Sequence, residues 1–138
     1  MKNLKSVKIF LFATGMIGII IGASLLLIPI AFEASAGIHL DNEVNILSEV
    51  RAPGGTLMAA GLLIASGAFI SGMTYISIVL AALFYLSYGL SRTISIILDG
   101  LPTDTLVMAT VSEIIIGLMS LYILFKFPKP QYHGANLQ

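Results

Sequence analysis

Two residues of opposite charge interrupt long apolar segments in the second half of the chain. Arg92 follows the uncharged run 52–91, and Glu113 is the single charge within 105–125. A charge at the centre of a membrane helix costs about 2.5–3.5 kcal/mol on insertion scales, so each residue favours a partner. Both lie about equally far from Pro102, and antiparallel helices would therefore place them at one depth. The sequence predicts a buried Arg92–Glu113 salt bridge, gripped through two hydrogen bonds of the guanidinium fork.

Further polar residues flank this pair and extend it into a candidate ligand-binding or buried polar cluster. Its predicted members are Glu49, Arg51, Tyr85, Tyr88, Arg92, Asp99 and Glu113. Arg92 would anchor an anion, Glu113 would orient it, and the two tyrosines would form an aromatic wall. Three interpretations stay open, namely a structural clasp, a site for a ligand or solute, and a proton or ion path. The path is disfavoured because the inner halves of these segments hold no second titratable group.

Other groups that could do chemistry are sparse. His39, Asp41 and Glu43 alternate, so they would converge only on an extended strand, and a solvated loop is the favoured interpretation. His133 in the tail is interpreted in the same way. Sequence motifs for a nucleophile elbow, a zinc helix, a dinucleotide fold or a phosphate loop are absent. We therefore expect no catalytic residue, no metal and no cofactor, and an enzyme acting on a lipid-like substrate is the least favoured function.

The composition indicates a multi-pass integral membrane protein. Of 138 residues, 57% are hydrophobic and only 10% are charged, with a mean hydropathy of +0.99. Soluble domains carry about 25% charged residues. The net charge is zero, which argues against a nucleic-acid partner. Cysteine is absent, which excludes disulfides and thiol chemistry within this sequence. The lipid bilayer is the expected partner, and a prokaryotic inner or plasma membrane is the expected location.

The apolar runs predict one all-α domain over 1–138, an integral membrane four-helix bundle. The helices are expected at about 8–30, 53–71, 75–98 and 104–126, with an outer loop at 33–51 that contains a short surface helix. The first apolar run, 9–32, exceeds the roughly 7–15 residues of a secretory signal, so we expect an uncleaved helix. Pro29 marks its end or a kink. The surface helix should stop near Ala52, because Pro53 disfavours helical geometry before it and should itself begin the next helix.

Positive charge predicts the orientation of this bundle. The terminal side holds Lys2, Lys5, Lys8, Lys126 and Lys129, whereas the opposite loops offer Arg51 alone. Lysine and arginine concentrate on the cytoplasmic side, so both termini are expected in the cytoplasm. The tail 130–138 is short, polar and expected to be loose.

Small residues predict how the helices pack, because lipid does not drive helices together by hydrophobicity. They form Gly18-x-x-x-Gly22 in the first helix and a ribbon of Gly54, Gly61, Ala65, Ala68 and Gly72 in the second. Packing inside one bundle is favoured over a dimer face, and a homo-oligomer stays an alternative. In the last helix Thr110, Glu113, Gly117 and Ser120 share an inward face, and Val111, Ile114, Ile115 and Leu118 are expected to face lipid.

One arrangement of residues resembles a known family. It comprises Glu49-x-Arg51-Ala52-Pro53-Gly54-Gly55, then Arg92 with Asp99-Gly100, and then Glu113. Together these are similar to the uncharacterised bacterial four-span membrane proteins grouped as domain of unknown function 4345. The resemblance covers nearly the whole chain, from the first helix to Lys126. It implies a four-span architecture and directs attention to Arg51, Arg92 and Glu113, but it implies no activity.

Two functions of different classes follow from this reading. The first is binding or transport of a small anionic or amphipathic molecule, such as a lipid, in an outward-facing polar pocket. The second is a structural or accessory membrane subunit in which Arg92 and Glu113 only fix the register of the helices.

Overall fold

The computed structural model describes residues 2–127, with side chains from Leu4 onward. Every regular element in this part of the chain is helical, which confirms the predicted all-α class. The elements are α1 (Lys2–Leu27), α2 (Pro29–Ser35), α3 (Val44–Ser66), the 3₁₀ turn η1 (Ser71–Met73), α4 (Thr74–Asp99) and α5 (Asp104–Lys126). The tail 130–138, with the predictions made for it and for Lys129 and His133, lies outside the described residues.

Three segments in the described part of the chain are long and apolar enough to cross a membrane. They are Leu4–Leu27, Ser71–Asp99 and Asp104–Lys126. The four-span prediction is therefore only partly met. The first two turns of α3 carry Glu49 and Arg51, and glycine and alanine dominate the rest of the helix, so its mean hydropathy is lower than that of α1, α4 and α5.

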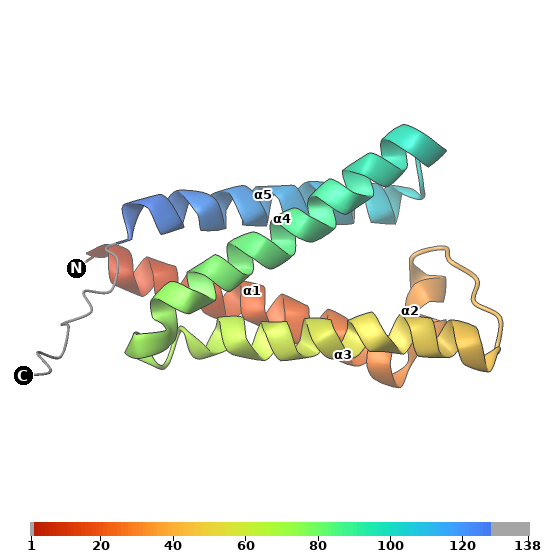
Figure 1. The fold of residues 1–138 in the computed structure, drawn as a ribbon, viewed down its shortest axis with the longest axis horizontal. Coiled ribbons are helices and arrows are strands. Elements are labelled where there is room, and N and C mark those ends of the chain that lie inside the picture. Colours follow the sequence, from red (N-terminus) through yellow and green to blue (C-terminus); the bar gives the residue numbers. More distant parts are fainter. Residues whose placement is uncertain (1, 128–138) are drawn as a thin grey trace, which may run out of the picture.

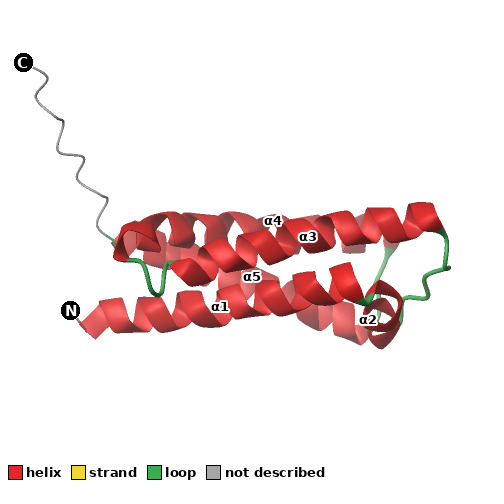
Figure 2. Ribbon diagram, turned by 90° about the horizontal axis from the view of Figure 1, so that it is seen from below, coloured by secondary structure: helices red, strands yellow, loops and turns green. Residues whose placement is uncertain are grey.

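The four long helices form two antiparallel hairpins, α1 with α3 and α4 with α5 (Figures 1 and 2). The start of α1, the α3–α4 turn and the end of α5 lie together, and we call this the terminal end. Helix α2, the loop 36–43 and the α4–α5 turn lie at the opposite, loop end.

The α1–α3 hairpin is held by backbone contact between small residues. A Cβ atom added to Gly61 of α3 would lie 2.5 Å from the amide nitrogen of Ile19, and one added to Gly15 would lie 2.5 Å from the amide nitrogen of Ala65. Gly18 and Gly22 of α1 face α3 at similarly close range. The predicted packing inside the chain is confirmed for Gly18, Gly22, Gly54 and Gly61, and Gly15 joins them without having been predicted. Gly72 meets open space and does not belong to the contact.

The predicted break at Ala52 is wrong. Helix α3 begins at Val44 and continues through Pro53, so the expected surface helix and the second long helix are one element. Contacts on both sides of the proline explain its tolerance. Arg51 Nε donates to the Leu26 carbonyl at 3.2 Å, and Gly54 packs against the backbone of the same α1 turn. Tertiary contact here overrides the local preference of the residue before proline.

The other helix boundaries show where local signals were sufficient. Helix α1 begins earlier than predicted and ends at Leu27, because Ile28 precedes Pro29 and is non-helical, with φ −133° and ψ 50°. Pro29 then starts α2, as its preference for a first helical turn indicates. Helix α3 ends at Ser66, five residues before the predicted 71 (71 − 66), since the chain turns at Gly67. Helices α4 and α5 match their predictions within one residue, with Gly100 turning at φ 99° between them.

The hydrophobic core lies in the terminal half, where the two hairpins meet. Its buried members are Val7, Leu11, Ile64, Ile78 and Ala81. At the edge of this core the Tyr85 hydroxyl of α4 donates to the Thr14 carbonyl of α1 at 2.6 Å. Beyond this tie α4 slants away from α3 toward the loop end (Figure 1).

Replacing Gly61 by alanine tests the backbone contact. Gly61→Ala should lower the free energy of unfolding by about 1–3 kcal/mol, because the new methyl group cannot fit against Ile19. Gly55→Ala is the matched control, since its Cβ meets nothing within 4 Å and alanine favours a helix by about 1 kcal/mol over glycine. Circular dichroism during thermal unfolding in detergent measures both variants. Equal melting temperatures for the two would contradict the contact.

Candidate functional site

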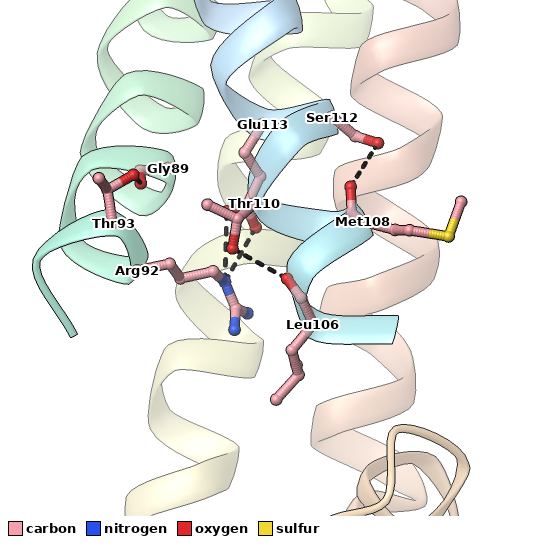
Figure 3. Close-up of polar contacts among 8 residues, drawn as sticks. All are labelled: Gly89, Arg92, Thr93, Leu106, Met108, Thr110, Ser112 and Glu113. Carbon is pink, nitrogen blue, oxygen red and sulfur yellow. Dashed lines mark hydrogen bonds and ion pairs between the residues drawn. The ribbon is translucent and has the colours of Figure 1, made fainter. Parts of the chain in front are cut away.

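Arg92 and Glu113 meet between the two helices of the α4–α5 hairpin (Figure 3). Arg92 Nε donates to Glu113 Oε1 at 3.3 Å and lies 3.2 Å from Oε2. The predicted pairing is confirmed, and so is the common depth that required it. Two details differ from the prediction. One nitrogen, not the fork, contacts the carboxylate: it donates to Oε1, whereas the buried Oε2 accepts no hydrogen bond within the described residues. The pair is only partly buried, with the Arg92 side chain 37% exposed and that of Glu113 17%.

Glycine contacts place the two charged residues opposite each other. A Cβ on Gly89 of α4 would lie 2.7 Å from Ile114 Cδ1, and one on Gly117 of α5 would lie 2.6 Å from Leu86 Cγ. The predicted inward face is confirmed for Gly117, Thr110 and Ser120, which are all buried. Of the four residues expected to face lipid, Val111, Ile115 and Leu118 are exposed. Ile114 was wrongly assigned, because Gly89 leaves room for its side chain to pack against α4.

A cavity of about 680 Å³ lies between the two hairpins, next to the charge pair. All five α-helices contribute to its lining, and Arg92 and Glu113 both face it. Most of its wall is apolar, with side chains such as Leu57 from α3 and Ile116 from α5. Its volume falls within the roughly 300–1,000 Å³ of small-molecule sites, which combine apolar walls with a few polar groups.

Besides Arg92 and Glu113, two more of the predicted residues line this cavity. Tyr88 lines it as an aromatic wall, as expected. Tyr85 lines it toward the terminal half, where its hydroxyl bonds to Thr14. Ile64 belongs both to the lining and to the hydrophobic core. The core therefore closes the cavity on the terminal side.

A second, smaller cavity of about 280 Å³ lies beneath the α4–α5 turn. Arg92, Asp99 and Thr110 line it, so Arg92 stands between the two spaces. Asp99 accepts a hydrogen bond from Ser95 at 3.1 Å and does not join the Arg92–Glu113 pair. Asp99 was predicted to extend the charge pair, but it only shares the wall of the smaller cavity with Arg92.

Glu49 and Arg51 lie apart from the charge pair, contrary to the predicted network. Neither residue lines either cavity. Arg51 instead bonds to the Leu26 carbonyl in the last turn of α1. A cation is favourable at a helix C-terminus, where carbonyl groups lack helical partners. Arg51 therefore joins α1 to α3 at the loop end.

Glu33 is a cavity residue that the sequence reasoning missed. It is half-buried on α2 and lines the large cavity beside Phe32. The segment was interpreted as a loop, in which a carboxylate would be solvated. The available signal was Pro29, because a proline at a first helical turn indicates a new helix that can redirect the following residues.

A strap closes part of the loop end. After α2 the chain turns at Gly37, with φ 82°, and Thr103 Oγ1 donates to the Ala36 carbonyl at 2.8 Å. This bond links the segment after α2 to the start of α5. Among residues 2–127, no three histidine, aspartate or glutamate side chains gather in a way that could hold a metal ion.

The three helices that are long and apolar enough to cross a membrane indicate a small helical membrane protein. The chain belongs to the family described as Domain of unknown function (DUF4345), whose model matches residues 6–124. Comparisons with curated proteins and with solved structures found no match. The family description assigns no activity, so a function has to be argued from the site.

A double-mutant cycle tests the energetic link between Arg92 and Glu113. Arg92→Gln and Glu113→Gln should each destabilise the protein, and the double variant should lose less than the sum, with a coupling of roughly 0.5–1 kcal/mol for so exposed a pair. Asp99→Asn is the control and should change stability by less than about 0.5 kcal/mol. Thermal unfolding followed by circular dichroism gives these values, since the chain has no tryptophan. Strictly additive effects would show that the pair has no coupling.

Proposed function

We propose that this chain is a multi-pass protein of the cell membrane that binds a small amphipathic molecule in the cavity between its hairpins. The polar group of the ligand lies against Arg92 and Glu113, and its apolar part lies between α1, α3 and α5. The observation that carries the proposal is one cavity that holds a charge pair on an otherwise largely apolar wall.

The guanidinium of Arg92 has donors to offer to such a ligand. Its Nε atom donates to Oε1 of Glu113 and lies 3.2 Å from Oε2. Its terminal nitrogens point away from that carboxylate (Figure 3), and they make no hydrogen bond within residues 2–127. Guanidinium forks bind carboxylate and phosphate groups through two parallel hydrogen bonds. Glu113 thereby orients Arg92 and leaves its fork directed toward other acceptors.

The apolar lining supports an amphipathic ligand over a fully polar solute. A polar molecule in contact with Leu57, Ile64 and Ile116 would lose hydration without gaining hydrogen bonds. A hydrocarbon chain loses nothing there, because the apolar wall resembles the lipid tails that the chain leaves.

The proposed membrane placement includes α3 as a fourth spanning helix. It has 23 residues, so at about 1.5 Å per residue it is roughly as long as the 30 Å hydrocarbon layer. Its charged turns lie at the loop end, where they can reach the interface. Lys5, Lys8 and Lys126 lie at the terminal end, so the positive-inside rule puts that end in the cytoplasm and the cavity in the outer half.

Binding is favoured over passage of a solute. The core around Leu11 and Ile78 fills the terminal half, and both residues are fully buried. Transport would require the hairpins to separate there. A structural or accessory subunit is the second candidate, and it is favoured by one observation: Arg92 and Glu113 join neighbouring helices of one hairpin, as a clasp would.

Exchanging the two charges separates these candidates. Arg92→Glu combined with Glu113→Arg retains the clasp but moves the cation to the other helix. The proposed site predicts that the exchanged protein stays folded but loses its co-purified ligand. A structural clasp predicts that folding and cellular activity are both restored, and that result would contradict the site.

Filling the cavity tests the proposed binding directly. Ala109 lines the cavity on α5, so Ala109→Phe should remove a co-purified ligand by occupying its volume. Met108→Phe is the matched control, because Met108 is 71% exposed on the same helix and does not line the cavity. Native mass spectrometry of gently extracted protein should show a bound mass in the wild type and the control, reduced at least about tenfold in Ala109→Phe. Equal retention in all three proteins contradicts the proposal.

Single cysteines test the orientation, because the natural chain has none. Asp41→Cys and Asp104→Cys at the loop end should react with a membrane-impermeant maleimide on intact cells. Ser6→Cys at the terminal end should react only after permeabilisation. The reverse pattern would place the cavity in the cytoplasmic half.

A further inference from the structure

The charges around the large cavity do not balance. Its lining holds one cationic side chain, Arg92, and two acidic ones, Glu113 and Glu33, a formal sum of +1 − 2 = −1. A purely anionic ligand would add further negative charge to a site whose formal sum is already negative. We infer that the ligand is zwitterionic, with an acidic group such as a phosphate or carboxylate on Arg92 and an ammonium group on Glu33. This inference rests on the proposed function and names its ligand class.

The acidic half of the ligand follows from the incomplete pairing of Arg92. The Nε atom lies 3.2–3.3 Å from the Glu113 oxygens, longer than the roughly 2.7–2.9 Å of strong charge-assisted bonds. A single shared nitrogen therefore leaves part of the guanidinium charge available.

The cationic half follows from Glu33. Its side chain is half-buried in the wall of the same cavity and forms no ion pair or side-chain hydrogen bond in the described part of the chain. A partly buried carboxylate without a partner favours an opposite charge beside it. An ammonium group on the ligand supplies that charge and three donors.

The fold holds Glu33 in place independently of any ligand. The amides of Ala36 and Ile38 both donate to the Glu33 carbonyl, at 3.0 and 2.9 Å, and so end α2 in a tight turn. Thr103 then ties the Ala36 carbonyl to the start of α5. Glu33 therefore faces the cavity from the α1–α3 hairpin and its strap, while Arg92 faces it from α4. Glu33 on α2 would bind the ammonium end of a zwitterion, and Arg92 on α4 would bind its acidic end.

Two sources could supply this chemistry, the headgroup of a zwitterionic phospholipid and a free zwitterion. Native mass spectrometry with delipidated protein separates them. The probes are lysophosphatidylethanolamine, lysophosphatidylglycerol and monoacylglycerol with the same acyl chain, and free phosphoethanolamine. The zwitterionic lysolipid should bind roughly tenfold more tightly than the anionic one and more tightly still than the neutral one. Free phosphoethanolamine binding as tightly as its lysolipid would support the same charge pattern with a soluble source.

Single substitutions test which residues cause the preference for the zwitterionic lysolipid. Glu33→Gln should bring the affinity ratio of the zwitterionic to the anionic lysolipid to about one, whereas Glu49→Gln, which removes an exposed charge outside the cavity, should leave it unchanged. Arg92→Gln should weaken both phosphate-containing lysolipids. Circular dichroism checks that each variant keeps its helices.

The outcomes distinguish this inference from the proposed function. An anionic lysolipid that binds the wild type as well as the zwitterionic one, or a ratio insensitive to Glu33→Gln, overturns the zwitterion alone. Failure of all four probes to bind, or binding unaffected by Ala109→Phe, overturns the cavity as a ligand site and the zwitterion with it.

Discussion

The backbone contact between α1 and α3 is the constraint on which the rest of the structure depends. Apolar side chains gain little by leaving lipid for a helix interface, so close approach at glycine supplies the packing that holds the helices together. Gly15 and Gly61 bring the two backbones so near that no side chain fits between them. This rigid hairpin meets α4 in the terminal half, through the core and the Tyr85–Thr14 bond. Because α4 then slants away, the loop half is left with a cavity (Figure 1).

The charge pair gains its chemical interest from being only partly buried. In a fully buried, bidentate pair each charge would be neutralised by the other, and neither group could bind a ligand. Such a pair would only hold the helices together. Here the side-on contact through Nε holds the guanidinium against α5 while its fork stays directed elsewhere (Figure 3). Glu33 adds a third charge from the other hairpin. The site is thus assembled from elements distant in the sequence, and its charges lie where the hairpins separate.

Much of the fold follows from local pattern, and the exceptions have physical causes. The apolar runs and the Gly100 turn predict the bounds of α4 and α5 within one residue. Arg92 and Glu113 lie about equally far from the turn between these antiparallel helices, which predicts that they pair. The continuous α3 could not be predicted, because the contacts with α1 on both sides of Pro53 are not visible in the sequence. The place of Glu33 depends on the turn at Ile28, before Pro29, and the cavity depends on the angle between the hairpins. Neither the turn nor the angle leaves a periodic signal in a single sequence.

NMR can test directly whether an amphiphile occupies the space between the hairpins. The protein would carry labelled isoleucine methyl groups and be studied with a protonated zwitterionic lysolipid in otherwise deuterated micelles. Ile64 and Ile116 line the cavity, and Ile64 is only 2% exposed, whereas Ile94 and Ile115 face outward at 56% and 52%. The account predicts cross-peaks from the lysolipid chain to Ile64 and Ile116. Cross-peaks confined to Ile94 and Ile115 would contradict it.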